Sequence, residues 1–247
     1  MCKFSKTVPG DKVPQGATWV ICPSCRYRFE FTGIKPDAEG IGESPWERRA
    51  EIGLWQGIYQ TFKSVLFSPA RFFRGMPTGK GTGEPLAFGL LLGSLGYMVG
   101  FFWEFLILSG TLRSYGDGLF DLIPMNWIFI FVMIISPVLV IVNMFFTGAI
   151  IHAMMLGLKG GKKGFEGTFR VIAFGQATHA LSFIPFIGGF IGWFWHLVLV
   201  IIGLREIHET SYATAITAVF FTIILKGIML LPLFFIKNLI SALGFSG

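Results

Sequence analysis

The chain has 247 residues, of which 53% are hydrophobic and only 14% are charged, and its mean hydropathy is +0.67. Soluble domains carry about 25% charged residues, and a chain of this length cannot bury so much apolar surface in one water-soluble core. The composition excludes an ordinary cytosolic enzyme and a disordered chain. The 28 Phe and 32 Gly residues favour helices packed in lipid, and three Cys are too few for a disulfide scaffold.

The first 16 residues are polar and lack the apolar run of a secretory signal, so we expect this end to lie in the cytoplasm. Cys22 and Cys25 then form a CxxC pair, a spacing at which two thiolates can bind one zinc ion. Cys2 is a third candidate ligand, but a structural zinc site needs four. No other Cys or His precedes His152. The CxxC alone therefore also fits a redox pair or two cysteines with no special role, although a redox fold context is absent.

Residues 2–31 resemble the small zinc-ribbon finger that begins many bacterial membrane and regulatory proteins. The resemblance rests on residues 8–14 (VPGDKVP), on residues 22–25 (CPSC) and on the Phe-rich residues 29–31. In that alignment the upstream partner of Cys2 would precede Met1. The resemblance implies a β module with structural zinc over residues 1–32, and a metal-free remnant of such a finger is the alternative. A Gly-rich linker over residues 33–45 follows.

Residues 46–83 are predicted to form an amphipathic segment at the membrane interface. Ser44, Pro45 and Glu47 have the spacing of a capping box with Pro at the first helical position. Apolar residues then recur at helical spacing among basic and polar ones, which is typical of an interfacial helix; a helix packed on the cytosolic face of a bundle has the same pattern. The apolar positions are Ile52, Trp55, Ile58, Tyr59, Phe62, Val65 and Leu66.

Two short motifs end this segment. Ser68-Pro69 repeats the Ser-Pro helix start. The Gly-rich loop 75–83 lacks the spacing of a phosphate-binding Walker loop, in which Ser or Thr directly follows Lys. We therefore expect this loop to be a hinge that leads into the membrane.

Five apolar segments are candidates to cross a bilayer. The third of them is short and rather polar, and Pro137 is expected to kink the second. We therefore predict an all-α, polytopic membrane domain of about five helices over residues 84–240, preceded by the small β module. The five segments are Leu86–Ser109, Trp127–Leu156, Thr168–Phe183, Phe186–Leu204 and Ala213–Ile236.

The placement of Lys and Arg predicts the orientation. If the N-terminus is inside, 17 basic residues lie on the inner side and 2 on the outer side, so the positive-inside rule places the N-terminus in the cytoplasm and the C-terminus outside. Basic residues near the inner surface are candidate contacts for anionic lipid headgroups, although ordinary solvated charge explains them as well. They are Arg71, Arg74, Lys159, Lys162 and Lys163.

Polar residues inside apolar segments are costly in lipid and are functional candidates for that reason. A pair across helices between Glu104 and Lys226 is one possibility, and a packed core histidine is the simpler explanation of His196. Four glycines of the first span form a stripe that lets another helix approach, from this chain or from a second copy. The stripe is Gly89, Gly93, Gly96 and Gly100, and the candidate buried polar site comprises Glu104, His152, Gln176, His179 and His196.

Catalytic patterns are missing from the sequence. His208-Glu209 begins an HExxH-like string, but Tyr212 stands where the second His belongs, and there is no GxSxG motif. The membrane explains the basic, aromatic N-terminal region better than nucleic-acid binding does.

Residues 46–220 resemble bacterial Yip-domain proteins, relatives of the eukaryotic Rab-interacting membrane proteins. The resemblance rests on residues 65–73 (VLFSPARFF), residues 160–171 (GGKKGFEGTFRV), Ile184-Pro185 and residues 201–204 (IIGL). It implies a five-span helical domain with a cytosolic N-terminus, and no enzymatic activity.

Our leading hypothesis is a non-enzymatic scaffold in a bacterial cytoplasmic membrane. It would engage lipid and protein partners through its basic face, with self-association through the glycine-lined helices as a further possibility. The alternative is a small-solute or ion transporter, or a channel subunit, that uses the buried polar residues.

Overall fold

The computed structural model describes residues 19–30, 42–115 and 125–242. The chain divides into two compact units, Met1–Gly40 and Ile41–Gly247. We describe each unit by itself.

The N-terminal unit contains a two-stranded antiparallel hairpin, β1 (Trp19–Ile21) and β2 (Arg28–Glu30). Between the strands, the Cys22 N–H donates to the Tyr27 carbonyl at 3.0 Å, and the Arg26 N–H donates to the Cys22 carbonyl at 2.9 Å. The CxxC motif therefore forms the tight connection of the hairpin, which brings Cys22 and Cys25 to the same turn.

Three short helices open the second unit: α1 (Arg49–Ile52), α2 (Leu54–Phe67) and α3 (Pro69–Phe73). The hydrogen bonds of the predicted capping box are present, because the Ser44 N–H donates to Glu47 Oε2 at 2.8 Å and the Glu47 N–H donates to Ser44 Oγ at 3.3 Å. They close a turn over residues 45–48, however, and α1 itself begins only at Arg49. Pro69 occupies the start of α3, as its Ser-Pro motif predicts.

The apolar positions of the predicted amphipathic segment are divided between two helices. Gly53 has φ 95° and ψ 148°, a conformation that L side chains rarely adopt, and it separates α1 from α2. Ile52 and Trp55 therefore lie on different helices. Helix α2 buries Gly57, Thr61, Val65 and Leu66 and exposes its other face.

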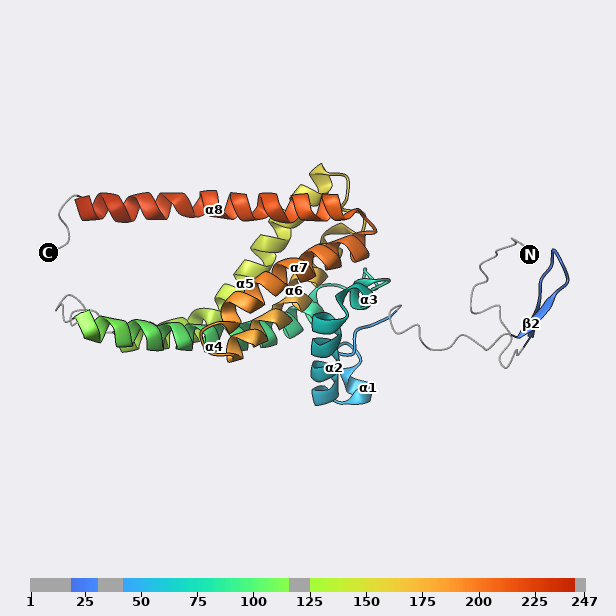
Figure 1. Ribbon diagram of the computed structural model, residues 1–247, viewed down its shortest axis with the longest axis horizontal. Coiled ribbons are helices and arrows are strands. Elements are labelled where there is room, and N and C mark those ends of the chain that lie inside the picture. The colour runs from blue at the N-terminus through green and yellow to red at the C-terminus, as the bar shows by residue number, and fades with distance from the viewer. Residues whose placement is uncertain (1–18, 31–41, 116–124, 243–247) are drawn as a thin grey trace. The chain divides into compact units, whose positions relative to one another are not determined.

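Long helices make up the remainder of the unit, and Figure 1 shows their arrangement. Four of the described helices are long and apolar enough to cross a membrane: Gly83–Gly110, Trp127–Gly157, Gly188–His208 and Tyr212–Met229. The elements are α4 (Gly83–Tyr115), α5 (Met125–Gly157), α6 (Gly164–Gly175), the 3-10 helix η2 (Gln176–Phe183), α7 (Gly188–His208) and α8 (Tyr212–Ala242).

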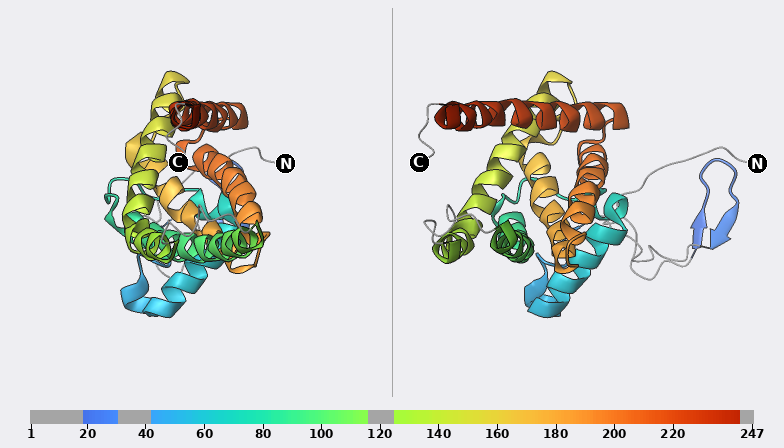
Figure 2. Two further views of the ribbon diagram at one scale, coloured as in Figure 1. Left: turned by 90° about the vertical axis from the view of Figure 1, so that its left-hand side faces the viewer. Right: turned by 60° about the vertical axis from the view of Figure 1, so that its left-hand side comes forward.

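Successive long helices run in alternating directions. In Figure 1, α4 begins beside α2 and runs to the left, and α8 begins near the end of α7 and also runs to the left. These two helices are not parallel, because the right-hand view of Figure 2 looks nearly along α4 while α8 lies across it. Pro137 lies within α5, whose first part packs on α4 through Phe129, 4.5 Å between ring centroids from Phe105.

The third predicted span, residues 168–183, is interior to the bundle. It begins earlier than predicted, at Gly164, and is α-helical only to Gly175, after which η2 continues to Phe183. All residues from Gly167 to Thr178 are buried, because α4, α5 and α7 pack around them. Enclosure by protein explains how a segment that is too polar to face lipid occupies this position.

The core lies where α3, α4, α6 and α7 meet. Phe73, Phe88 and Phe174 are fully buried there, and the Phe88 and Phe174 rings are 5.3 Å apart between centroids. Large apolar side chains on the outer faces of α5, α7 and α8 are exposed, Phe221 among them at 51%. An apolar outer surface around a packed interior suits helices that sit in lipid.

Candidate functional site

The glycine stripe of α4 packs against η2 of the same chain. A Cβ atom at Gly93 would lie 3.0 Å from the Gln176 side-chain oxygen, and one at Gly96 would lie 2.4 Å from the His179 carbonyl oxygen. Residues three apart eclipse each other in a 3-10 helix, so Gln176 and His179 lie on one face, as the sequence predicts. The absent Cβ atoms allow the two backbones to approach closely. These glycines thus contact a helix of the same chain. Self-association through glycine-lined helices stays a prediction.

Gln176 has an unpaired polar atom. The residue is 1% exposed, and its amide nitrogen donates to the Ile172 carbonyl at 3.3 Å. Its side-chain oxygen has no hydrogen-bond partner among the described residues, and neither has the buried hydroxyl of Ser94 on α4. An unsatisfied buried acceptor costs about 1–3 kcal/mol. A hydrogen-bond donor that reached the Gln176 oxygen at the α4–η2 contact would therefore stabilise the protein.

His179 and His196 lie next to each other between η2 and α7. Their ring centroids are 5.5 Å apart, and the Tyr97 ring of α4 lies 4.5 Å from that of His179. His196 Nδ1 is 3.1 Å from the Gly175 carbonyl oxygen and 3.2 Å from the Thr178 hydroxyl. Because a carbonyl only accepts, Nδ1 carries a proton in its bond to Gly175. His196 thus has the contacts of a packed core histidine, located where α6 becomes η2.

Two further histidines share the Thr168 hydroxyl. The Lys163 N–H donates to His208 Nδ1 at 3.1 Å, so Nε2 carries the proton of the neutral ring. His208 Nε2 lies 2.9 Å from Thr168 Oγ1, which lies 3.0 Å from His152 Nδ1. The hydroxyl therefore accepts from His208 and donates to His152. The sequence pointed to His152, but we missed Thr168 and considered His208 only as part of a failed zinc motif.

Lys226 pairs with neutral groups on α5 rather than with Glu104. Its Nζ lies 3.2 Å from Asn143 Oδ1 and 2.5 Å from Thr147 Oγ1. Glu104 is exposed on α4 and has no ion pair with any described residue. The expected Glu104–Lys226 pair is therefore absent. Asn143 has its partner on α8, and His152 has its partner on α6. The two residues are nine positions apart, which at about 100° per residue puts them about half a turn out of phase, so one helix cannot direct both at one partner.

The most buried ionic group is Arg170 of α6, which we had counted only as a positive charge of the loop. Its side chain is 0% exposed and forms ion pairs with Glu47 at 2.8 Å and with Glu166 at 3.1 Å. Its third contact is the Gly81 carbonyl, at 3.4 Å. The i,i+4 spacing of Glu166 and Arg170 was a detectable signal; the pair with Glu47, 123 residues away, was not.

Glu166 also holds the Gly-rich loop 75–83. The Gly79 and Lys80 N–H groups donate to its two carboxylate oxygens at 2.8 and 3.1 Å. Burial opposes ionisation, but these backbone donors and Arg170 outweigh it and lower the pKa of Glu166. The loop that we expected to act as a hinge is thus fixed to α6 through one carboxylate, and Lys80 pairs with Glu43.

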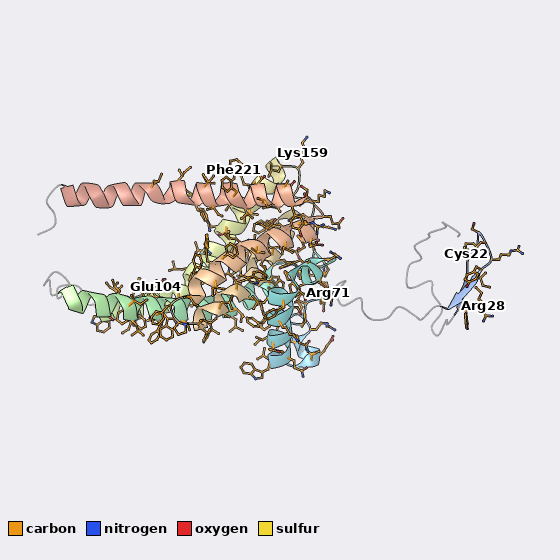
Figure 3. The ribbon with its side chains drawn as sticks, in the orientation of Figure 1. Cys22, Arg28, Arg71, Glu104, Lys159 and Phe221 are labelled. Carbon is orange, nitrogen blue, oxygen red and sulfur yellow. The ribbon has the colours of Figure 1, made fainter. Side chains whose placement is uncertain are left out.

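Three of the five candidate lipid-binding residues are engaged within the protein. Arg74 pairs with Glu206 at 3.0 Å, Lys163 pairs with Glu209 and lowers its pKa by a hydrogen bond, and Lys162 donates to the Glu209 carbonyl. Arg71 and Lys159 are exposed and have no ion pair with any described residue. Figure 3 places both at the same end of the helical unit, away from Glu104.

The predicted zinc site is described only in part. Cys22 is half-buried and Cys25 is exposed, and the hairpin turn presents both, as a zinc knuckle would. Cys2 lies outside the described residues. In the part of the chain that the structure describes, no three His, Cys, Asp or Glu side chains are grouped to hold a metal ion. The described part of the finger thus supplies two of the four ligands that a structural zinc site needs, and zinc binding stays a prediction.

Comparison with known proteins identifies the helical unit. The model of the Yip1 domain matches residues 63–234, more than half of the chain. No curated protein and no solved structure matches it. The domain, together with four helices that are long and apolar enough to cross a bilayer, marks a multi-pass integral membrane protein. The resemblance to Yip-domain proteins is thereby confirmed, and the chain belongs to the Yip1-domain family.

Proposed function

We propose that this protein is a non-enzymatic membrane scaffold that crosses the membrane five times, with its N-terminus in the cytoplasm and its C-terminus outside. The observation that carries the proposal is a set of exposed aromatic residues on α2, a helix that ends four residues before the exposed and unpaired Arg71. Trp55 is 81% exposed, Tyr59 62% and Phe67 76%. Exposed aromatic rings beside basic side chains are suited to a lipid headgroup region.

The five crossings are supported by the length of the interior segment. Helix α6 and η2 together extend for about 34 Å, at about 1.5 Å per α-helical residue and about 2.0 Å per 3-10 residue. A hydrocarbon core is about 30 Å thick. This segment would therefore be a crossing that protein shields from lipid, and it would place the loop after η2 on the side opposite the basic surface.

Arg170 helps to fix the position of α2 on the bundle. It joins Glu47, which precedes α1, to α6 of the bundle, while the Trp46 N–H donates to the Thr61 hydroxyl of α2 at 2.7 Å. Both contacts are buried, so α2 has a fixed position on the bundle. In the proposed scaffold, this fixed position would hold the exposed aromatic residues of α2 and Arg71 at one depth against anionic headgroups. The N-terminal hairpin, with zinc if the ligand set is completed, would serve as a separate module for protein contact.

The test is the enrichment of anionic phospholipid around the purified protein. The full chain is solubilised from mixed phosphatidylglycerol and phosphatidylcholine bilayers, and the retained lipids are quantified by mass spectrometry. Arg71→Gln and Lys159→Gln should each reduce the enrichment of phosphatidylglycerol. Lys163→Gln is the matched control, because Lys163 already forms an ion pair with Glu209. Equal retention of the two lipids by the unaltered protein would contradict the proposal, as would an equal loss in the control.

Transport of a small solute is a second candidate, favoured by the polar groups between α4, η2 and α7. In many transporters the binding site lies at an interrupted helix inside the membrane, and the change from α6 to η2 is such an interruption. Flux in proteoliposomes that is lost in His179→Ala would support transport. Flux equal to that of protein-free vesicles would exclude it for the solute tested.

A further inference from the structure

Lys226 occupies an unusual position for a lysine. It lies about 21 Å along α8 from Tyr212, at about 1.5 Å per residue, and Asn143 lies about 21 Å along α5 from Gly157. Both helix ends belong to the basic end of the unit. Measured from these helix ends, a bilayer core of about 30 Å would place the Lys226–Asn143 pair inside the hydrocarbon, about 9 Å from its far face.

The Lys226 ammonium has only neutral acceptors. It donates to Asn143 Oδ1 at 3.2 Å and to Thr147 Oγ1 at 2.5 Å, and it has no ion pair with a carboxylate of the described residues. The side chain is only half-exposed. An ammonium group inside the hydrocarbon without a carboxylate partner is expensive, so this position would favour the binding of an anion.

The neighbouring groups add donors rather than acceptors. The Thr147 hydroxyl lies 3.3 Å from Asn143 Oδ1 and donates to it. Asn143 Oδ1 thus receives two hydrogen bonds, while the amide nitrogen of Asn143 has no acceptor among the described residues. One ammonium N–H and the Asn143 amide N–H groups are therefore available to donate, and no carboxylate of the described residues pairs with Lys226.

From this arrangement we propose that Lys226, Asn143 and Thr147 form an intramembrane binding site for a small monovalent anion, such as chloride or acetate. The anion supplies the charge that the described side chains lack and accepts from the ammonium and from the Asn143 amide. Thr147 orients the amide by donating to its oxygen. The site is independent of the lipid surface at α2, and binding there requires no transport.

The experiment measures anion-dependent thermal stability of the full chain in neutral detergent. Chloride or acetate replaces gluconate, a bulky monovalent anion, at constant ionic strength, because a ligand that binds only the folded state raises its midpoint. We expect a saturable rise of about 2 °C or more in the unaltered protein. The rise should disappear in Lys226→Met and shrink in Asn143→Leu, while Lys159→Met, an exposed lysine, should retain it.

Two results would overturn the proposal. One is the same anion response in Lys226→Met as in the unaltered protein. The other is no response to chloride or acetate, including the case in which only an added anionic phospholipid stabilises the chain. If Lys226→Met does not fold, Asn143→Leu and Thr147→Val decide, because both keep the lysine and alter only its neutral partners.

Discussion

Replacing Arg170 with methionine is expected to destabilise the helical unit more than any other single charge removal at this end of the bundle. Methionine keeps much of the apolar stem but removes the ion pairs with Glu47 and Glu166, at 2.8 and 3.1 Å. Glu47 is 6% exposed and would lose the one cation that pairs with it among the described residues, although Ser44 still donates to it. Breaking a buried pair from one side costs about 3–5 kcal/mol.

The assay is thermal unfolding of the full chain in detergent, followed by intrinsic tryptophan fluorescence. For a protein of this size, 1 kcal/mol shifts the midpoint by about 2–4 °C, so Arg170→Met should lower it by about 6–20 °C. Arg49→Met is the matched control, because its pair with Glu84 is solvent-exposed, at 30% and 47%, and such pairs contribute about 0–1 kcal/mol. A midpoint for Arg170→Met within 2 °C of the control would refute the reasoning.

Three further predictions concern packing, hydrogen bonding and pH. Gly96→Ala should destabilise by about 1–3 kcal/mol, because its Cβ would meet the His179 backbone at 2.4 Å; Gly227→Ala, with no neighbour within 4 Å, should be neutral, and equal midpoints would contradict the α4–η2 contact. Thr168→Val should cost about 1–3 kcal/mol by leaving two imidazole nitrogens unpaired, whereas Thr168→Ser should restore stability; failure of that rescue would count against the shared hydroxyl. The pKa of Glu166 is lowered on folding, so its stabilisation is present above the pKa of the unfolded chain and is lost as pH falls through the folded value. Glu166→Gln should therefore lose less stability than the unaltered protein as the pH falls. The test is to measure unfolding curves of both proteins between about pH 6 and about pH 3, where carboxyl groups titrate, and the same pH dependence in both would contradict the prediction.

Local features of this fold were predictable because they depend on neighbouring residues. The capping box of Ser44 and Glu47 requires only a three-residue spacing, and the glycine stripe of α4 follows from helical periodicity. The long apolar runs predicted one end of each of α4, α5, α7 and α8 within a few residues. Each of these signals is contained within one or two turns of helix.

Features set by tertiary packing were not predictable from one sequence. The break at Gly53 depends on how α1 and α2 fit the bundle, since glycine is compatible with a helix interior at moderate cost. The change to a 3-10 helix at Gln176 is linked to close packing against Gly93 and Gly96. The partner of Arg170 lies 123 residues away, a separation over which sequence spacing carries no geometric information.

The central claim is that α6 and η2 form a fifth crossing, so that the two ends of this segment lie on opposite sides of the membrane. The most direct measurement is labelling of single cysteines with a membrane-impermeant maleimide, in intact cells and in inverted vesicles, on a chain whose native Cys are replaced by Ser. Lys159→Cys and Phe186→Cys place the label at exposed positions before α6 and after η2. The account predicts that Phe186→Cys is labelled in intact cells and Lys159→Cys only in inverted vesicles. Labelling of both positions from the same side would contradict it.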